Sequence, residues 1–291
     1  MSQPTRSQIA PLQQVMTGVL RWRGGISESV TDELVAEEPL EIRIRAGDGA
    51  TETLAVILRT PGHDDELAAG FLFSEGLLRA RGELAALAPG VDPDGLPSDN
   101  VLDVVSAPDV DLLRRVHDEG YSRSFAVNAS CGVCGKNSVA TACATLPPIP
   151  LDGFAVAPET LYALPNRLHA QQRVFAHTGG LHAAGLFDAT GTLLALREDI
   201  GRHNAVDKLL GHALLDGALP LRERILLVSG RLSFEIVLKA LVAGIPLIAA
   251  VSAPSSLAVD LAAASGITVA AFLRGENVNV YTHPERMRAS H

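Results

Sequence analysis

Hydrophobic and polar positions alternate in several short segments of the N-terminal half. Residues 39–47, PLEIRIRAG, place three apolar side chains between charged ones, which predicts a half-buried strand. Residues 53–60 form a more continuously apolar run that predicts a second strand, ended by Pro-Gly. A helix is predicted over 63–78, a loop over the proline- and glycine-rich 89–99, and a third strand over 100–107. Residues 1–20 are predicted to form a mobile tail.

The C-terminal half has a sharper pattern of alternating strands and helices. Apolar runs at 225–230, 246–252 and 267–273 suit buried parallel strands. Each of the two segments between them begins with a serine and ends at a glycine, which predicts helices over 233–244 and 255–266. Earlier in the chain we expect an irregular connection over 144–158, a helix from Pro158 to about Gln172, and a hairpin whose turn is DATG. The pattern predicts an α/β layered sheet.

Composition narrows the classes of protein that fit. The 291 residues are 47% apolar and 20% charged, enough for one large core or two closely packed ones. The net charge of −9 argues against broad nucleic-acid or anionic-membrane binding. The first twenty residues lack a continuous apolar run, and charged side chains interrupt the most apolar region, 225–253, so no membrane span is predicted. The cell interior is the expected compartment, which disfavours a structural disulfide.

Two of the three cysteines stand in the loop sequence SCGVCGK. Cys131 and Cys134 are close enough to share a metal or to act as a redox pair, and they could also serve as sulfur-handling nucleophiles or be simply buried. The flanking glycines favour access to the sulfurs, and Lys136 favours the thiolate. A zinc site would need completion by Cys143 or by histidine 177, 182, 203 or 212, and none of these gives a common spacing. A thioredoxin-like role would place the motif near the start of a βαβ unit, whereas here it lies mid-chain.

Four polar segments follow, each at the predicted end of a strand or start of a helix. They are TGGLHAA, REDIGRHNAVDKLLG, SGRLSFE and FLRGENVNVYTHP. Taken separately, each could be a solvent-exposed turn or helix face. Together they suggest loops at strand ends that hold a large phosphorylated ligand. The candidate binding residues in them are His182, Arg202, His203, Ser229, Arg231, Phe272, Leu273, Arg274, Gly275, Glu276 and Asn277.

The order of these motifs resembles the FdhD family, the formate dehydrogenase accessory sulfurtransferases. The matching segments include CGVCGK, TGGLHAA, REDIGRHNAVDKLLG, SGRLSFEIVLKA and ITVAAFLRGENVNVYTHPERM, with EEPLEIRI and GFLFSEGLL nearer the N-terminus. The resemblance implies a cytidine-deaminase-like, three-layer α/β/α core with an N-terminal α+β part, in a cytoplasmic homodimer. We therefore expect a tail over 1–20, an N-terminal subdomain over 21–125 and a deaminase-like domain over 126–291.

The same resemblance implies a chemistry. A cysteine desulfurase would load sulfur onto Cys131 as a persulfide, with Cys134 as its partner thiol. The sulfur would pass to the molybdenum (or tungsten) bis(molybdopterin guanine dinucleotide) cofactor, a transient ligand, before its insertion into apo formate dehydrogenase. Residues 272–277 correspond to the cofactor-binding stretch of the family, no resident metal is expected, and Cys143 has no assigned role. The alternatives are a cofactor-binding chaperone without sulfur chemistry and a zinc hydrolase. The order of residues opposes the hydrolase, because no Glu follows His182 at the required spacing.

Overall fold

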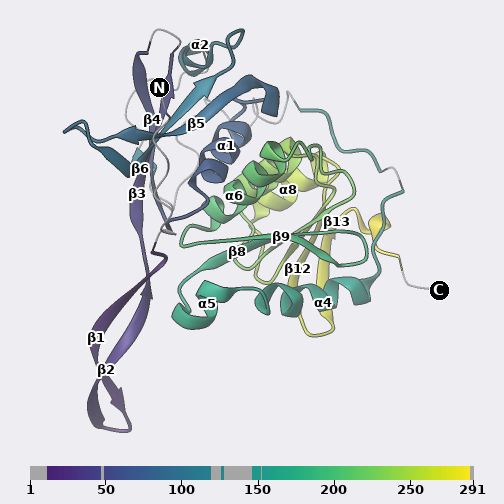
Figure 1. The fold of residues 1–291 in the computed structure, drawn as a ribbon. Helices are drawn as coiled ribbons and strands as arrows, with labels where there is room; N and C mark the ends of the chain where they lie inside the picture. The colour runs from purple at the N-terminus through teal and green to yellow at the C-terminus, as the bar shows by residue number, and fades with distance from the viewer. Residues whose placement is uncertain (1–11, 47–48, 119–125, 128–145, 152, 289–291) are drawn as a thin grey trace.

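The computed structural model describes residues 12–46, 49–118, 126–127, 146–151 and 153–288 (Figure 1). Its strands form a two-stranded ribbon, a five-stranded sheet and a six-stranded sheet. The three groups follow one another along the chain. The ribbon and the five-stranded sheet belong to the N-terminal half, and the six-stranded sheet belongs to the C-terminal half.

The ribbon consists of β1 (Gln14–Arg23) and β2 (Ile26–Val35), paired antiparallel along their whole length. The predicted mobile tail is therefore wrong for residues 14–20. Alternation in this segment is weak, and its strand conformation depends on hydrogen bonds to β2, which the segment itself does not reveal. Residues 1–11 lie outside the described residues.

The five-stranded sheet has the order β5-β6-β3-β4-β7. Its strands are β3 (Glu38–Arg45), β4 (Thr51–Arg59), β5 (Leu84–Val91), β6 (Pro97–Ser106) and β7 (Ala126–Val127). The predicted strands are confirmed, and the predicted helix is α1 (Asp64–Ser74), which ends four residues before the predicted Leu78. The short η1 (Arg81–Glu83) and α2 (Leu112–Asp118) complete this half. The loop predicted over 89–99 is shorter, because Asp92 accepts hydrogen bonds from the backbone of Asp94 and Leu96 and closes a tight turn between β5 and β6.

The six-stranded sheet has the order β13-β12-β11-β10-β8-β9. The hairpin of β8 (His182–Phe187) and β9 (Leu193–Asp199) and the parallel strands β10 (Ile225–Val228), β11 (Leu247–Ala250) and β12 (Thr268–Arg274) are as predicted. Strand β13 (Asn277–Thr282) adds to β12 antiparallel, and η2 (Pro284–Arg286) follows it.

Helices cover both faces of this sheet. Alternate residues of β10 enter different core clusters: Leu226 packs with α6 (Arg202–Leu215), α7 (Phe234–Val242) and α8 (Ser256–Ala264), whereas Leu227 packs with α4 (Pro158–His169). Figure 1 shows α5 (Arg173–Thr178) beside α4. Helix α4 ends three residues before the predicted Gln172. The described half is thus a three-layer arrangement, which is the predicted α/β class.

Two glycines let the halves of the molecule approach closely. Helices α1 and α6 cross where a Cβ on Gly70 would lie 1.8 Å from the carbonyl oxygen of Asp207, and one on Gly211 would lie 1.8 Å from that of Glu66. A real side chain at either position would force the helices apart. The first core cluster accordingly runs without interruption from β3 through α1 and α6 to β11. The boundary predicted between residues 125 and 126 falls just before β7, which pairs with β4 of the N-terminal sheet.

Candidate functional site

The carboxyl ends of four strands meet at one edge of the six-stranded sheet. Strand β8 is antiparallel to both β9 and β10, so β9 runs in the same direction as the parallel set β10, β11 and β12. Helix α6 starts after β9 at Arg202, the turn Ser229–Arg231 follows β10, and Phe272 lies near the end of β12. The topology therefore brings the four polar segments to one edge, as ligand sites in open α/β sheets require.

His182 stands at this edge, between β9 and β10. It begins β8, and Ser229 fixes that strand start because its Oγ accepts a hydrogen bond of 2.9 Å from the backbone nitrogen of Ala183. A Cβ on Gly230 would lie 3.1 Å from Nδ1 of His182, so the absence of a side chain there leaves room for the imidazole. Burial, together with the positive charges of Arg202 and Arg231, lowers the pKa of His182. The imidazole is therefore neutral at pH 7.

Arg202 supplies a positive charge beside this imidazole. Its Cδ would lie 3.9 Å from a Cβ at Gly230, which places it against the same turn. The Nε of Arg202 is buried and has no hydrogen-bond partner among the described residues. A buried donor of this kind forms its hydrogen bond with a water or with an anionic group of a ligand. Arg231 follows Gly230 and is exposed, so both guanidinium groups fit an anionic ligand at this edge.

His203 points to a second polar pair at the start of α7. Its Nε2 lies 3.0 Å from Oγ of Ser233 and 3.6 Å from Oε2 of Glu235. Hydrogen bonding with His203 lowers the pKa of Glu235 to about 2, so this carboxylate is ionised at neutral pH. Helices α6 and α7 are thus linked at their N-terminal ends, and the link holds the His203 ring beside Arg202.

The segment 272–277 lies at the same edge, with β11 between it and β10. Phe272 is 38% exposed and has a left-handed backbone with φ of 55°, at a bulge between β12 and β13. Arg274 ends β12, and Gly275 and Glu276 form the exposed turn into β13, where the amide of Asn277 donates to the carbonyl of Arg274 at 3.3 Å. Leu273 is buried in the core, so its side chain does not face this edge.

Half of the polar cluster at 197–211 is structural, a role that the sequence analysis missed. Asp199 is fully buried and accepts hydrogen bonds from the backbone nitrogen of Thr60 and from the side-chain amide of Asn204, and it pairs with Lys208 at 2.7 Å. Asp207 pairs with Lys239 at the same distance. Part of the sequence signal for this role was present: Asn204, Asp207 and Lys208 are spaced by three and four among apolar residues, which puts them on one face of α6.

The two glycines of TGGLHAA also have structural roles. Gly179 ends α5 in a left-handed conformation with φ of 64°. A Cβ on Gly180 would lie 3.2 Å from a methyl of Val35 in the ribbon. Only His182 of this motif joins the cluster at the sheet edge.

All three cysteines lie outside the described residues. The described chain reaches Val127 in β7, whose register partner is Ile57 of β4. The next residue of β4, Leu58, accepts a hydrogen bond of 2.8 Å from Asn204 in the first turn of α6. The chain that leads into the cysteine motif therefore passes close to the start of α6, where Arg202 and His203 stand.

Comparison with known proteins identifies the group to which this arrangement belongs. The model of the FdhD/NarQ family matches residues 35–288. The chain belongs to the FdhD/NarQ family. It is 51% identical over 278 residues to the sulfur carrier protein FdhD of Streptomyces avermitilis, covering 92% of this chain and 94% of that protein. The FdhD protein of Thermoplasma volcanium is 43% identical over 256 residues, covering 88% and 89% of the two chains.

A solved structure supports the same assignment. The crystal structure of a chain from Desulfotalea psychrophila, described as that of a formate dehydrogenase accessory protein, matches with a TM-score of 0.71 and 25% identity. The match covers 95% of this chain and all of that one. The resemblance stated from the motifs is thereby confirmed at the level of the family.

Within the described residues, no group of three or more His, Cys, Asp or Glu side chains is placed to hold a metal ion. No described helix is long and apolar enough to cross a membrane.

Proposed function

We propose that this FdhD/NarQ chain is a cytoplasmic sulfurtransferase that carries sulfur on Cys131 to a molybdenum bis(molybdopterin guanine dinucleotide) cofactor destined for formate dehydrogenase. The convergence of His182, Arg202 and Arg231 at the sheet edge carries the proposal, because it suits the phosphates of a dinucleotide. The relatives that are 43% and 51% identical to this chain are named sulfur carriers, which fits the CxxC motif.

The loading step is a thiol exchange with a cysteine desulfurase. The thiolate of Cys131 attacks the outer sulfur of the donor's cysteine persulfide, a new S–S bond forms on Cys131, and the donor cysteine leaves as a thiolate. Release has two routes. In the first, the outer sulfur bonds to the thiophilic metal of the substrate as its bond to Sγ breaks, Cys131 leaves as a thiolate, and the reduced metal supplies the two electrons that convert the sulfur to sulfide. In the second, Cys134 attacks Sγ of Cys131, the S–S bond to the outer sulfur breaks, and hydrosulfide leaves as the disulfide closes.

Chain length allows Cys131 to lie close to the sheet edge that forms the candidate site. Cys131 is four residues beyond Val127, and four extended residues span at most about 14 Å. The side chains at the edge then have separate roles in binding. Arg202 and Arg231 bind phosphate, the turn of residues 274–277 holds the guanine or ribose, and the neutral imidazole of His182 packs against the ligand without adding charge. The homodimer and the cytidine-deaminase-like fold of the core belong to the proposal as well.

Complementation of a strain that lacks this gene tests the proposal. We expect Cys131→Ala to lower formate dehydrogenase activity at least 100-fold, because the sulfur acceptor is lost, while the purified variant melts at the wild-type temperature. Cys143→Ala is the matched control and should retain activity, since it removes a thiol outside the motif. Wild-type activity with Cys131→Ala would contradict the proposal.

A chaperone without sulfur chemistry is the competing function. It would bind the cofactor or apo formate dehydrogenase at the same edge and would use the thiols for regulation alone. The double variant Cys131→Ala/Cys134→Ala separates the two functions, because only the chaperone would still support maturation.

A further inference from the structure

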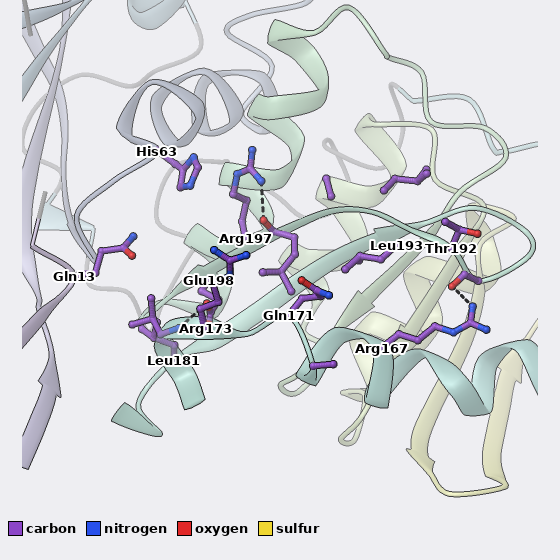
Figure 2. A pocket seen from close by; sticks show the side chains of 16 residues that line it. Gln13, His63, Arg167, Gln171, Arg173, Leu181, Thr192, Leu193, Arg197 and Glu198 are labelled. Carbon is purple, nitrogen blue, oxygen red and sulfur yellow. Dashed lines mark hydrogen bonds between the residues drawn. The ribbon is translucent and has the colours of Figure 1, made fainter. Parts of the chain in front are cut away.

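An elongated groove runs along β9, the outer strand of the six-stranded sheet. It has a volume of about 1050 Å³ and is lined along its length by residues 191–198. Strand β9 is last in the order of the described sheet, so one side of its backbone has no neighbouring strand there. Figure 2 shows Arg167 at one end of the groove, and Gln13, His63 and Arg173 at the other. An open strand edge within a groove is the kind of surface to which an extended peptide adds through main-chain hydrogen bonds.

An exposed arginine stands near each end of the groove. Arg167, on α4, donates to two backbone carbonyls of the hairpin turn just before β9 begins. Arg173 is the first residue of α5, and the next residue, Val174, donates its backbone N–H to the carboxylate of Glu198 near the end of β9. The two arginines therefore flank the whole strand, whose seven residues span roughly 24 Å.

The other charged side chains that line the groove already have partners. Arg197 pairs through two nitrogens with Glu66, and Nδ1 of His63 lies 3.1 Å from the same carboxylate. The carboxylate of Glu198 accepts two backbone N–H groups at the start of α5, at 3.2 and 3.0 Å. The arginines at the two ends have no carboxylate partner among the described residues. The groove thus has an uncompensated positive charge at each end, on a chain whose net charge is −9.

Between these two charges the groove is apolar. Leu193, Leu194 and Leu196 line it, and Leu194 is 47% exposed. Val174 and Leu181 add apolar surface near the end of the strand. An exposed leucine in a concave apolar surface is typical of a contact site. The segment that complements this groove is therefore extended, apolar in its middle and acidic at both ends.

We propose that β9 binds such a segment of a partner protein as an added strand of the sheet. The backbone of the segment pairs with the open side of β9, its apolar side chains pack on the three leucines, and its two carboxylates pair with Arg167 and Arg173. Both arginines come from helices on the same face of the sheet, so the carboxylates and the apolar side chains occupy alternate positions of the segment. This docking uses none of the cysteines, so either proposal can fail while the other stands.

Fluorescence anisotropy with the full chain and a labelled peptide tests the docking. The peptide is the nonapeptide Glu-Thr-Val-Thr-Val-Thr-Val-Thr-Glu, which places its carboxylates and its valines on one face of an extended chain. We expect saturable binding of this acidic peptide, and binding weaker by about 30-fold when both end residues are lysine, because two charge-assisted pairs are lost.

Methylation of the peptide nitrogens tests the strand pairing itself. Only alternate N–H groups of an added strand face its neighbour. Methylation of the odd-numbered or of the even-numbered residues should therefore abolish binding, whereas methylation of the other set should leave it nearly unchanged. Equal effects of the two sets would contradict pairing with β9.

Two variants of the groove test its charges and its apolar part separately. Arg167→Glu/Arg173→Glu should bind the acidic peptide about 30-fold more weakly and should bind the lysine-ended peptide instead. Leu194→Asp should weaken binding of the acidic peptide about tenfold, because it places a carboxylate on the contact surface without changing the core.

Matched controls change exposed residues outside the groove. Arg114→Glu/Arg222→Glu and Leu96→Asp should bind the acidic peptide like the wild type, and melting temperatures near the wild-type value would show that each variant is folded. A wild-type chain that does not bind the acidic peptide, or binds both peptides equally, would overturn the proposal and leave the groove to a second copy or to another segment of this chain. Unchanged binding in both groove variants would overturn it too.

Discussion

The two halves of the polar cluster at 197–211 differ in what surrounds them. Asp199, Asn204, Asp207 and Lys208 are buried, and their partners come from β4, α1 and α7. Arg202 and His203, on the same helix, are only partly buried and stand at the sheet edge. One segment therefore joins the two sheets through one face and contributes to the candidate site through the other.

This difference shows how the site can keep its charges in a fixed place. The buried pairs hold α6 against β4 and α1, so the first turn of α6 cannot shift relative to the strand ends. The partly buried side chains at the edge then remain available to a ligand. Substitutions in the buried set should lower stability, whereas substitutions at the edge should lower binding.

The largest effect is expected from Lys239→Met. Lys239 pairs with Asp207 inside the protein, and its loss leaves a buried carboxylate without its charge partner. We expect the free energy of unfolding at pH 7 to fall by about 3–5 kcal/mol, measured by urea denaturation. The double variant Lys239→Met/Asp207→Leu should recover most of this loss, because no buried charge remains. If the single variant is as stable as the wild type, the pair of Asp207 and Lys239 does not stabilise the packing of α6 against α7.

The same variant has a predictable pH dependence. Burial raises the pKa of Asp207, and Lys239 opposes that rise. Removing the lysine therefore raises the pKa further, so the folded variant binds a proton more tightly than the unfolded chain does. Its stability deficit should be greatest at pH 7 to 8 and should shrink as the pH falls toward the range where carboxyl groups protonate. Urea denaturation at several pH values measures this trend.

A smaller loss is expected where the helices cross. In Gly211→Ala the new methyl group would meet the carbonyl oxygen of Glu66, and the helices must separate. We expect a loss of about 3 kcal/mol, even though alanine favours a helix over glycine by up to about 1 kcal/mol. Gly82→Ala is the control, because no atom lies within 4 Å of its Cβ position. Equal stability of the two variants would contradict the close crossing.

Glu66→Gln should have an intermediate effect that depends on pH. Burial opposes ionisation of Glu66, but hydrogen bonds from Arg197 and His63 lower its pKa to about 2. The carboxylate is 15% exposed, so we expect a loss of about 2 kcal/mol at pH 7. Because the folded pKa lies below the ordinary 4.5, this stabilisation is present above pH 4.5 and fades as the pH falls toward 2. The wild-type and variant stabilities should converge over that interval in urea denaturation, and a constant difference would contradict the assignment.

The smallest effect on stability, but a clear effect on binding, is expected from Arg231→Ala. Arg231 is exposed, so the melting temperature should stay within about 1 °C of the wild-type value. Binding of GDP, measured by calorimetry, should weaken roughly tenfold because one charge-assisted contact to phosphate is lost. Arg222→Ala, which removes another exposed arginine, should bind GDP like the wild type. Unchanged GDP binding by Arg231→Ala would show that this arginine does not contribute to the ligand site.

The sequence predicted most of the C-terminal sheet, because its strands are uniformly apolar and its helices are bounded by Ser and Gly. It did not predict the ribbon, since the pairing of β1 with β2 depends on a partner strand rather than on local pattern. At the candidate site, it predicted Arg202, His203 and Arg231 as binding residues, which stays a prediction, and it could not distinguish partly buried from fully buried polar residues within one motif. That distinction follows from packing against α1 and β4, segments more than a hundred residues away in the sequence.

The central claim is that Cys131 carries sulfur, and mass spectrometry tests it most directly. The purified chain would be measured intact and after digestion, before and after incubation with a cysteine desulfurase and free cysteine. The account predicts a gain of one sulfur atom on the peptide that contains Cys131, removed by reductant and absent in Cys131→Ala. A bound zinc ion that survives gentle handling, without any sulfur adduct, would contradict it and assign the CxxC motif to metal binding.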